Sequence, residues 1–97
     1  MTPRQKLIEF HAKMTTEARE LMIKKNADYA AEGDPFKNFR TFGTFGILVR
    51  LSDKLARLQG FEERHELAVK DESIRDTILD VVNYAVLYEA MRTEGEE

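Results

Sequence analysis

Apolar residues recur at spacings of three and four along three separate stretches of this 97-residue chain. That spacing gathers them on one face of a helix, so each stretch is predicted to form one α-helix. We expect the helices to span about residues 3–26, 45–59 and 71–92, within a single all-helical domain over residues 1–97. The apolar face of the first helix comprises Leu7, Phe10, Met14, Ala18, Leu21 and Met22, and that of the second comprises Ile47, Leu48, Leu51, Leu55 and Leu58.

Residues at the ends of the predicted helices support these bounds. Thr2 is suited to cap the first helix ahead of Pro3, and Gln5 completes a capping box with Thr2. Gly60 is well placed to end the second helix. Between the first two helices, Gly33-Asp34-Pro35 has the composition of a turn, in which the aspartate caps the residues that follow.

The segment between the first two helices is unusually aromatic. It contains Tyr29 and then Phe36, Phe39, Phe42 and Phe45, which are spaced by three. Phenylalanines in such a loop more often fill the core than stack on a ligand, so we expect most of them to be packed inside.

The third predicted helix is apolar on every side between Val81 and Tyr88, apart from Asn83. A helix of this kind is normally buried on every side. A chain of this length buries only about 60–65% of the surface that it exposes when unfolded, and two other helices can hardly cover the third. We therefore expect a three-helix domain that assembles as a helical-bundle homo-oligomer, either a dimer or a tetramer.

Composition excludes several classes of protein. The chain has no cysteine, which favours a reducing compartment, and its two histidines are too few for a histidine-rich zinc site. It contains no apolar run typical of a signal peptide or a membrane span. Its net charge of −3 argues against general nucleic-acid binding. We expect a cytoplasmic protein that does not enter membranes.

Glu72, Asp76 and Asp80 follow one another at intervals of four, so they lie along one stripe of the third helix. Three like charges on one stripe repel unless a lysine, an arginine or Mg²⁺ lies against them. A solvated acidic face is an equally good interpretation of the first two. Asp80 differs, because it and Asn83 fall inside an apolar run where an unpartnered carboxylate is costly.

A matching cluster lies on the second helix, at Arg50, Asp53, Lys54 and Arg57. The simpler interpretation is a surface network worth a few tenths of a kcal/mol per ion pair. The alternative is that the three basic side chains hold phosphates and that Asp53 ligates a metal bridging them.

A third group of candidates follows the first helix. Lys25 lies in its last turn, where a lysine commonly complements the helix dipole. Asp28 and Tyr29, together with Lys37 and Asn38, are instead placed to contact a nucleotide base.

These motifs resemble the nucleotide-modification-associated domain family of phages and bacteria, which is similar to the MazG-like all-α nucleotide pyrophosphohydrolases. The resemblance covers about residues 25–91. It rests on the runs Lys25-Asn26-Ala27-Asp28-Tyr29, Arg50-x-x-Asp53-Lys54-x-x-Arg57 and Glu72…Asp76-x-x-x-Asp80-x-x-Asn83-Tyr84.

The resemblance implies a helical oligomer in which two helices supply acidic ligands to Mg²⁺, and in which water cleaves a nucleoside triphosphate to the monophosphate and pyrophosphate. Asp53, Asp76 and Asp80 would be catalytic, and Glu72 would join them as a metal ligand. The nucleotide would be bound by Lys25, Asp28, Tyr29, Asn38, Arg50, Lys54, Arg57 and Asn83. The MazG-like pattern places an acid where this chain has Arg50 and another where it has Thr77, so one acid of each pair is missing.

Three hypotheses remain at this point. The first is a Mg²⁺-dependent nucleoside triphosphate pyrophosphohydrolase. The second is a phage protein that binds and sequesters a nucleotide or nucleotide-derived signal without catalysis. The third is a structural helical adaptor whose charged clusters are ordinary salt bridges.

Overall fold

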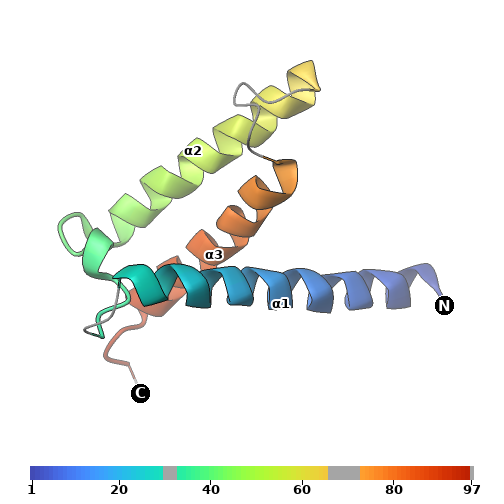
Figure 1. The fold of residues 1–97 in the computed structure, drawn as a ribbon. Helices are drawn as coiled ribbons and strands as arrows, with labels where there is room; N and C mark the ends of the chain where they lie inside the picture. The colour runs from blue at the N-terminus through green and yellow to red at the C-terminus, as the bar shows by residue number, and fades with distance from the viewer. Residues whose placement is uncertain (30–32, 66–72, 97) are drawn as a thin grey trace.

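The computed structural model describes residues 1–29, 33–65 and 73–96. It contains three α-helices, α1 (Pro3–Tyr29), α2 (Gly43–Arg64) and α3 (Ile74–Arg92), and a short 3₁₀ helix η1 (Lys37–Phe39) ahead of α2 (Figure 1). The described ranges contain no β-strand, which confirms the prediction of an all-α fold. None of the helices within them combines the length and the apolar character needed to cross a membrane.

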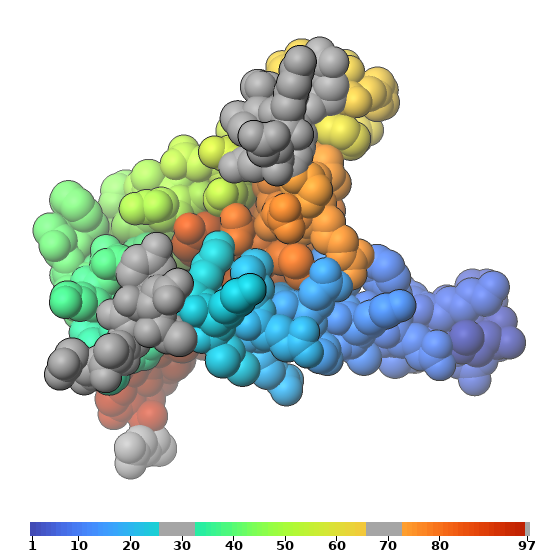
Figure 2. Space-filling view, viewed as in Figure 1, coloured from blue at the N-terminus to red at the C-terminus, as the bar shows by residue number. Residues whose placement is uncertain are grey.

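The helices form an open arrangement rather than a closed bundle. α2 and α3 pack against each other extensively, and α1 crosses α3 with a smaller contact. The first turns of α1 project away from both of the other helices (Figures 1 and 2). The C-terminal part of α1 therefore lies near η1 and α3, while its first turns lie far from them.

The start of α1 follows the predicted capping box. The backbone N–H of Gln5 donates to Thr2 Oγ1 at 3.1 Å, and the N–H of Thr2 donates to Gln5 Oε1 at 2.8 Å. Two backbone donors at the end of the helix are thereby satisfied by side chains.

The second helix is longer than predicted at both ends. It begins at Gly43, whose φ of 64° suits a residue without Cβ, and it ends at Arg64. The prediction that Gly60 ends this helix is wrong, because Gly60 lies inside α2. The stop is made by His65, which adopts a left-handed φ of 57° while its N–H donates to the Phe61 carbonyl.

The third helix begins with a side-chain cap at Ser73. Its hydroxyl accepts from the backbone N–H of Asp76 at 3.0 Å. The predicted start near residue 71 lies outside the described residues.

The buried core of the described chain is very small. Its buried residues are Ala18, Phe36, Ile47, Thr77 and Leu79. Among the loop aromatics, Phe36 is buried and Phe39 packs edge-on against Tyr84 with ring centroids 6.4 Å apart. The expectation of packed phenylalanines is wrong for Phe42 and Phe45, which are 74% and 70% exposed. Phe42 is the N-cap residue of α2, and Phe45 lies in its first turn.

Candidate functional site

A cavity of about 180 Å³ lies where the C-terminal part of α1 meets α3, the segment around η1 and the first half of α2. Its lining comprises Met22, Lys25, Asp34, Pro35, Lys37, Asn38, Phe39, Arg50, Asp80, Asn83, Tyr84 and Leu87. The lining thus combines apolar side chains with charged side chains from four separate elements.

Basic side chains outnumber acidic ones around this cavity. Lys25, Lys37 and Arg50 carry positive charges, and Asp34 and Asp80 carry negative ones. Lys37 and Arg50 are exposed, and neither forms an ion pair with another side chain in the described ranges. Two cations at the mouth of the cavity are therefore available to an anion from solution.

Asp80 is held between two lysines from two other helices. Its Oδ1 accepts from Lys25 Nζ of α1 at 3.1 Å, and its Oδ2 lies 3.1 Å from Lys54 Nζ of α2. The side chains of Asp80 and Lys54 are only 16% and 19% exposed, whereas Lys25 is about half exposed. The expectation that a carboxylate in this apolar run needs a partner is confirmed, and the partners are lysines.

Asn83 ties α3 to α1. Its side-chain N–H donates to the backbone carbonyl of Ala18 at 2.9 Å, in a half-buried position one turn from Asp80. This bond orients the amide at the edge of the cavity. A second tie between the same helices is the ion pair of Arg75 with Glu17, which lowers the pKa of that carboxyl.

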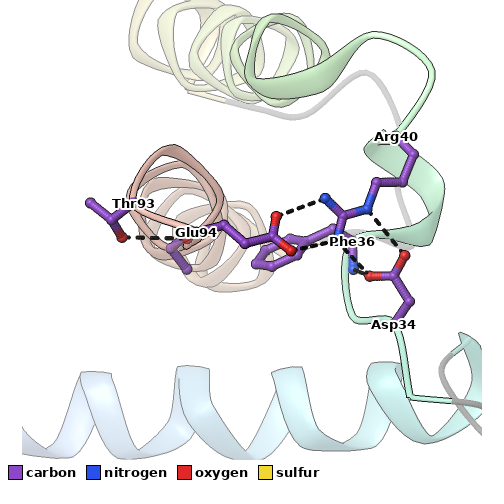
Figure 3. Close-up of polar contacts among 6 residues, drawn as sticks. Asp34, Phe36, Arg40, Thr93 and Glu94 are labelled. Carbon is purple, nitrogen blue, oxygen red and sulfur yellow. Dashed lines mark hydrogen bonds and ion pairs between the residues drawn. The ribbon is translucent and has the colours of Figure 1, made fainter. Parts of the chain in front are cut away.

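Arg40 holds the segment that carries η1 against the end of α3. Its guanidinium donates to both carboxylate oxygens of Asp34, at 3.0 and 3.1 Å, and to both of Glu94, at 2.7 and 2.8 Å (Figure 3). It also lies over the ring of Phe36, 5.2 Å from the centroid. These contacts lower the pKa values of Asp34 and Glu94, because Arg40 favours the charged carboxylates.

Asp34 also stabilises the turn that precedes η1. Its Oδ1 accepts from the backbone N–H of Phe36 at 3.0 Å, which confirms that it caps the turn begun by Pro35. Arg40 is shared between Asp34 and Glu94, so it offsets only part of the negative charge of the carboxylate that lines the cavity. Sequence reasoning missed Arg40 and Glu94, which are 54 positions apart and share no local motif.

The structure brings together some of the predicted site residues. Lys25, Asn38, Arg50, Asp80 and Asn83 line the cavity, and Lys54 reaches it through Asp80. The exposed Asp53, Arg57 and Asp76 are not part of its lining. Glu72 lies outside the described residues, and so do the side chains of Asp28 and Tyr29.

The described residues alone do not fit the predicted Mg²⁺ site. They contain no group of three or more histidine, cysteine, aspartate or glutamate side chains that could hold a metal ion. Mg²⁺ is bound through carboxylate oxygens and water, yet each oxygen of Asp80 already faces an ammonium group. The metal set that includes Glu72 stays a prediction.

Comparison with known proteins identifies no family for this chain. No protein-family model matches the chain, and no curated protein or solved structure matches it either.

Proposed function

We propose that this protein binds a nucleotide or nucleotide-derived anion by its phosphate group, without hydrolysing it. The observation that carries the proposal is the cavity bordered by Lys25, Lys37 and Arg50, two of which form no ion pair within the described ranges. Because the whole chain carries a net charge of −3, this basic cluster is a local feature that runs against its overall charge.

The size of the cavity suits one part of such a ligand. Pockets that enclose a drug-sized molecule measure about 300–1,000 Å³, whereas this one measures about 180 Å³. A phosphate group with its sugar occupies a space of that size, and the remaining part of the ligand extends past Asn38 and Phe39. Arginine and lysine side chains form strong charge-assisted hydrogen bonds to phosphate oxygens.

The arrangement of Asp80 favours binding over catalysis. A metal-assisted hydrolysis requires carboxylates that are free to hold the ion and to orient water. Here Asp80 is paired with two lysines, and Asp53 and Asp76 are exposed and do not line the cavity. The resemblance to MazG-like pyrophosphohydrolases remains the reason to test hydrolysis directly.

We also propose that the working unit is a homo-oligomer. The Cα radius of gyration is 15.3 Å, against about 12.5 Å for a compact domain of this length. Large apolar side chains are exposed on all three helices, including Leu7 of α1, Phe45 of α2 and Val86 of α3. Association of copies would cover this surface.

The test is a thermal-shift screen of nucleoside mono-, di- and triphosphates and cyclic nucleotides, with and without Mg²⁺. A ligand at one hundred times its Kd stabilises by about 2.7 kcal/mol, which for a domain of this size raises Tm by roughly 10 °C or more. Each hit is followed for pyrophosphate release. Stabilisation without turnover is the expected result.

Two variants test whether the rise in Tm comes from binding at the cavity. Lys37→Ala and Arg50→Ala each remove an exposed cation and are expected to weaken binding about tenfold. Lys6→Ala removes an exposed cation from the projecting end of α1 and serves as the matched control. Mg²⁺-dependent pyrophosphate release would replace the binding proposal with the hydrolytic one, and no stabilisation by any ligand would leave the helical adaptor.

A further inference from the structure

Helix α2 has two apolar faces, only one of which is used inside the chain. The inner face packs on α3 through residues such as Ile47, which is fully buried, and Lys54, which pairs with Asp80. A stripe of exposed positions, called the outer face here, repeats at alternating steps of three and four beside this inner face and includes Leu48 and Leu55 of the predicted apolar face. It comprises Phe45, Leu48, Ser52, Leu55 and Gln59, flanked by Val49 and Ala56.

This spacing is the a and d pattern of helices that pack along each other. Every one of these seven side chains is exposed in the described structure. A helix whose apolar residues extend beyond one face is normally covered on that further surface as well. The outer face of α2 is therefore an unpartnered helix-packing surface.

The exposed apolar side chains would supply a large share of one side of an interface. An aromatic side chain buries about 150–250 Å² when it is covered. Phe42 and Phe45 are 74% and 70% exposed, so these two residues alone present about 300 Å². Leu48, Val49 and Leu55, each 41–46% exposed, extend the same surface. One side of a standard protein interface covers about 800 Å².

We infer that the outer face of α2 packs against the same face of a second copy, around a two-fold axis near Ser52. A two-fold interface is made by one surface used twice, so a single self-complementary stripe is sufficient. Ser52 is the central position of the stripe, and Ala56 is the next small residue along it. Small side chains at the centre let two helices approach closely, while Phe45 and Gln59 lie at its two ends.

The interface borders the candidate site. A second hollow is lined by Asn38, Phe39, Phe42, Phe45, Gly46, Val49 and Arg50. Of these residues, Asn38, Phe39 and Arg50 also line the cavity described above. A helix from a second copy along the stripe would thus form a wall beside the mouth of each cavity. The interface itself does not depend on what the cavity binds.

Substitution of Ser52 is the sharpest test, because its effect differs between a face exposed to solvent and a face packed against a second copy. Glutamate has a higher helix propensity than serine, so Ser52→Glu is harmless on a solvent-exposed helix face. At the centre of a two-fold seam it places two carboxylates against each other. Sedimentation velocity of the full chain is expected to give a dimer for the unmodified protein and for Ser52→Ala, and a monomer for Ser52→Glu.

Cross-linking supplies a second measurement that does not require disruption of the fold. The chain has no cysteine, so Ser52→Cys carries a single thiol. A short bismaleimide is expected to convert this variant to covalent dimers, whereas Lys6→Cys, on the projecting part of α1, stays monomeric on denaturing gels. Circular dichroism confirms that each variant is helical.

Several results would overturn the inference. The inference is wrong if the unmodified protein sediments as a monomer at all concentrations. A dimer that survives Ser52→Glu, or that cross-links at residue 6 and not at residue 52, would place the interface elsewhere. Because none of these readouts uses a ligand, failure here is distinguishable from failure of the nucleotide-binding proposal.

Discussion

Asp80 is the residue on which all three helices converge. It belongs to α3, while the two ammonium groups that contact it come from Lys25 of α1 and Lys54 of α2. The carboxylate also lines the cavity, where it occupies the kind of position that a phosphate oxygen would take. It therefore pairs with two cations in the ligand-free protein, and under the proposed function it would compete with the anion that binds there.

This competition predicts the effect of Asp80→Asn. Removing the negative charge frees the two lysines to meet a phosphate, so affinity for a bound nucleotide or for pyrophosphate is expected to rise about tenfold, equivalent to about 1.4 kcal/mol. The ligand-free variant is expected to unfold at a lower temperature, because two cations lose the partner that they share. Isothermal titration calorimetry and thermal melts measure the two effects.

The control for Asp80→Asn is Glu62→Gln, which makes the same change of charge at an exposed position outside the cavity. It is expected to leave affinity unchanged. If Asp80 were instead a metal ligand, Asp80→Asn would weaken Mg²⁺-dependent binding. A loss of affinity would therefore count against the role proposed for this carboxylate.

At the scale of single elements, α2 contains a glycine that the helix does not require. Gly60 lies inside the helix, and the nearest atoms that a Cβ there would meet belong to the guanidinium end of Arg64, the closest at 2.5 Å. That end belongs to a flexible, exposed side chain, which can move aside. Gly60→Ala is thus expected to raise the free energy of unfolding by about 0.5–1 kcal/mol.

Gly43 provides the contrast within the same helix. A Cβ added there would meet no atom within 4 Å, yet the φ of this residue is +64°. That conformation costs an L-residue about 1–2 kcal/mol. Gly43→Ala is therefore expected to destabilise the protein. Urea denaturation of both variants measures the two changes, and stabilisation by Gly43→Ala would contradict the helix start described above.

The stability contributed by the segment before α2 depends on pH, because Arg40 in this segment pairs with two carboxylates. The pKa values of Asp34 and Glu94 are lowered by their hydrogen bonds to this guanidinium. A carboxyl whose pKa is lower in the folded protein stabilises it above the pKa of the unfolded chain, and this contribution is lost as the pH falls through the folded value. The contribution is thus present at neutral pH and disappears in acid.

Arg40→Gln is expected to lower Tm, with the largest difference from the unmodified protein above about pH 5 and a smaller one toward about pH 3. A residual difference remains at low pH, because the variant also loses the stacking on Phe36. Thermal melts across this range measure the effect, with Arg4→Gln as the control for charge. A difference that does not change with pH would show that the ion pairs contribute nothing.

At the scale of the whole molecule, the open arrangement explains why so few of the described residues are buried. Within the described ranges, the contacts of α1 with α3 run from Phe10 to Lys25 and leave its first turns exposed, and α2 packs on α3 through one face. Association would supply the missing contacts, and Tm would then rise with protein concentration. The cavity depends on the same arrangement, because each of the three helices and η1 contributes to its lining.

Much of the fold follows from relations between residues a few positions apart. The capping box of Thr2 and Gln5, the turn cap of Asp34 and the apolar periodicity of the helices involve neighbours in the chain, so they can be predicted without coordinates. The end of α2 cannot, because a left-handed His65 is a rarer stop than the glycine at position 60. The exposure of Phe42 and Phe45 cannot either, since it depends on which face of α2 meets α3.

The candidate site, like the fold, could be predicted from the sequence only in part. The sequence by itself determined that the chain is helical, that the carboxylate of Asp80 needs a partner, and that basic side chains gather on the second helix. These conclusions follow from helical spacing and from the cost of burying a charge, which are both local properties. Only the tertiary structure decided that Lys25 and Lys54 are the partners and that Asp53 and Asp76 stay outside the cavity. Lys25 and Asp80 are 55 positions apart. Contact between them depends on how the helices cross and rotate, which the local pattern of neither helix specifies.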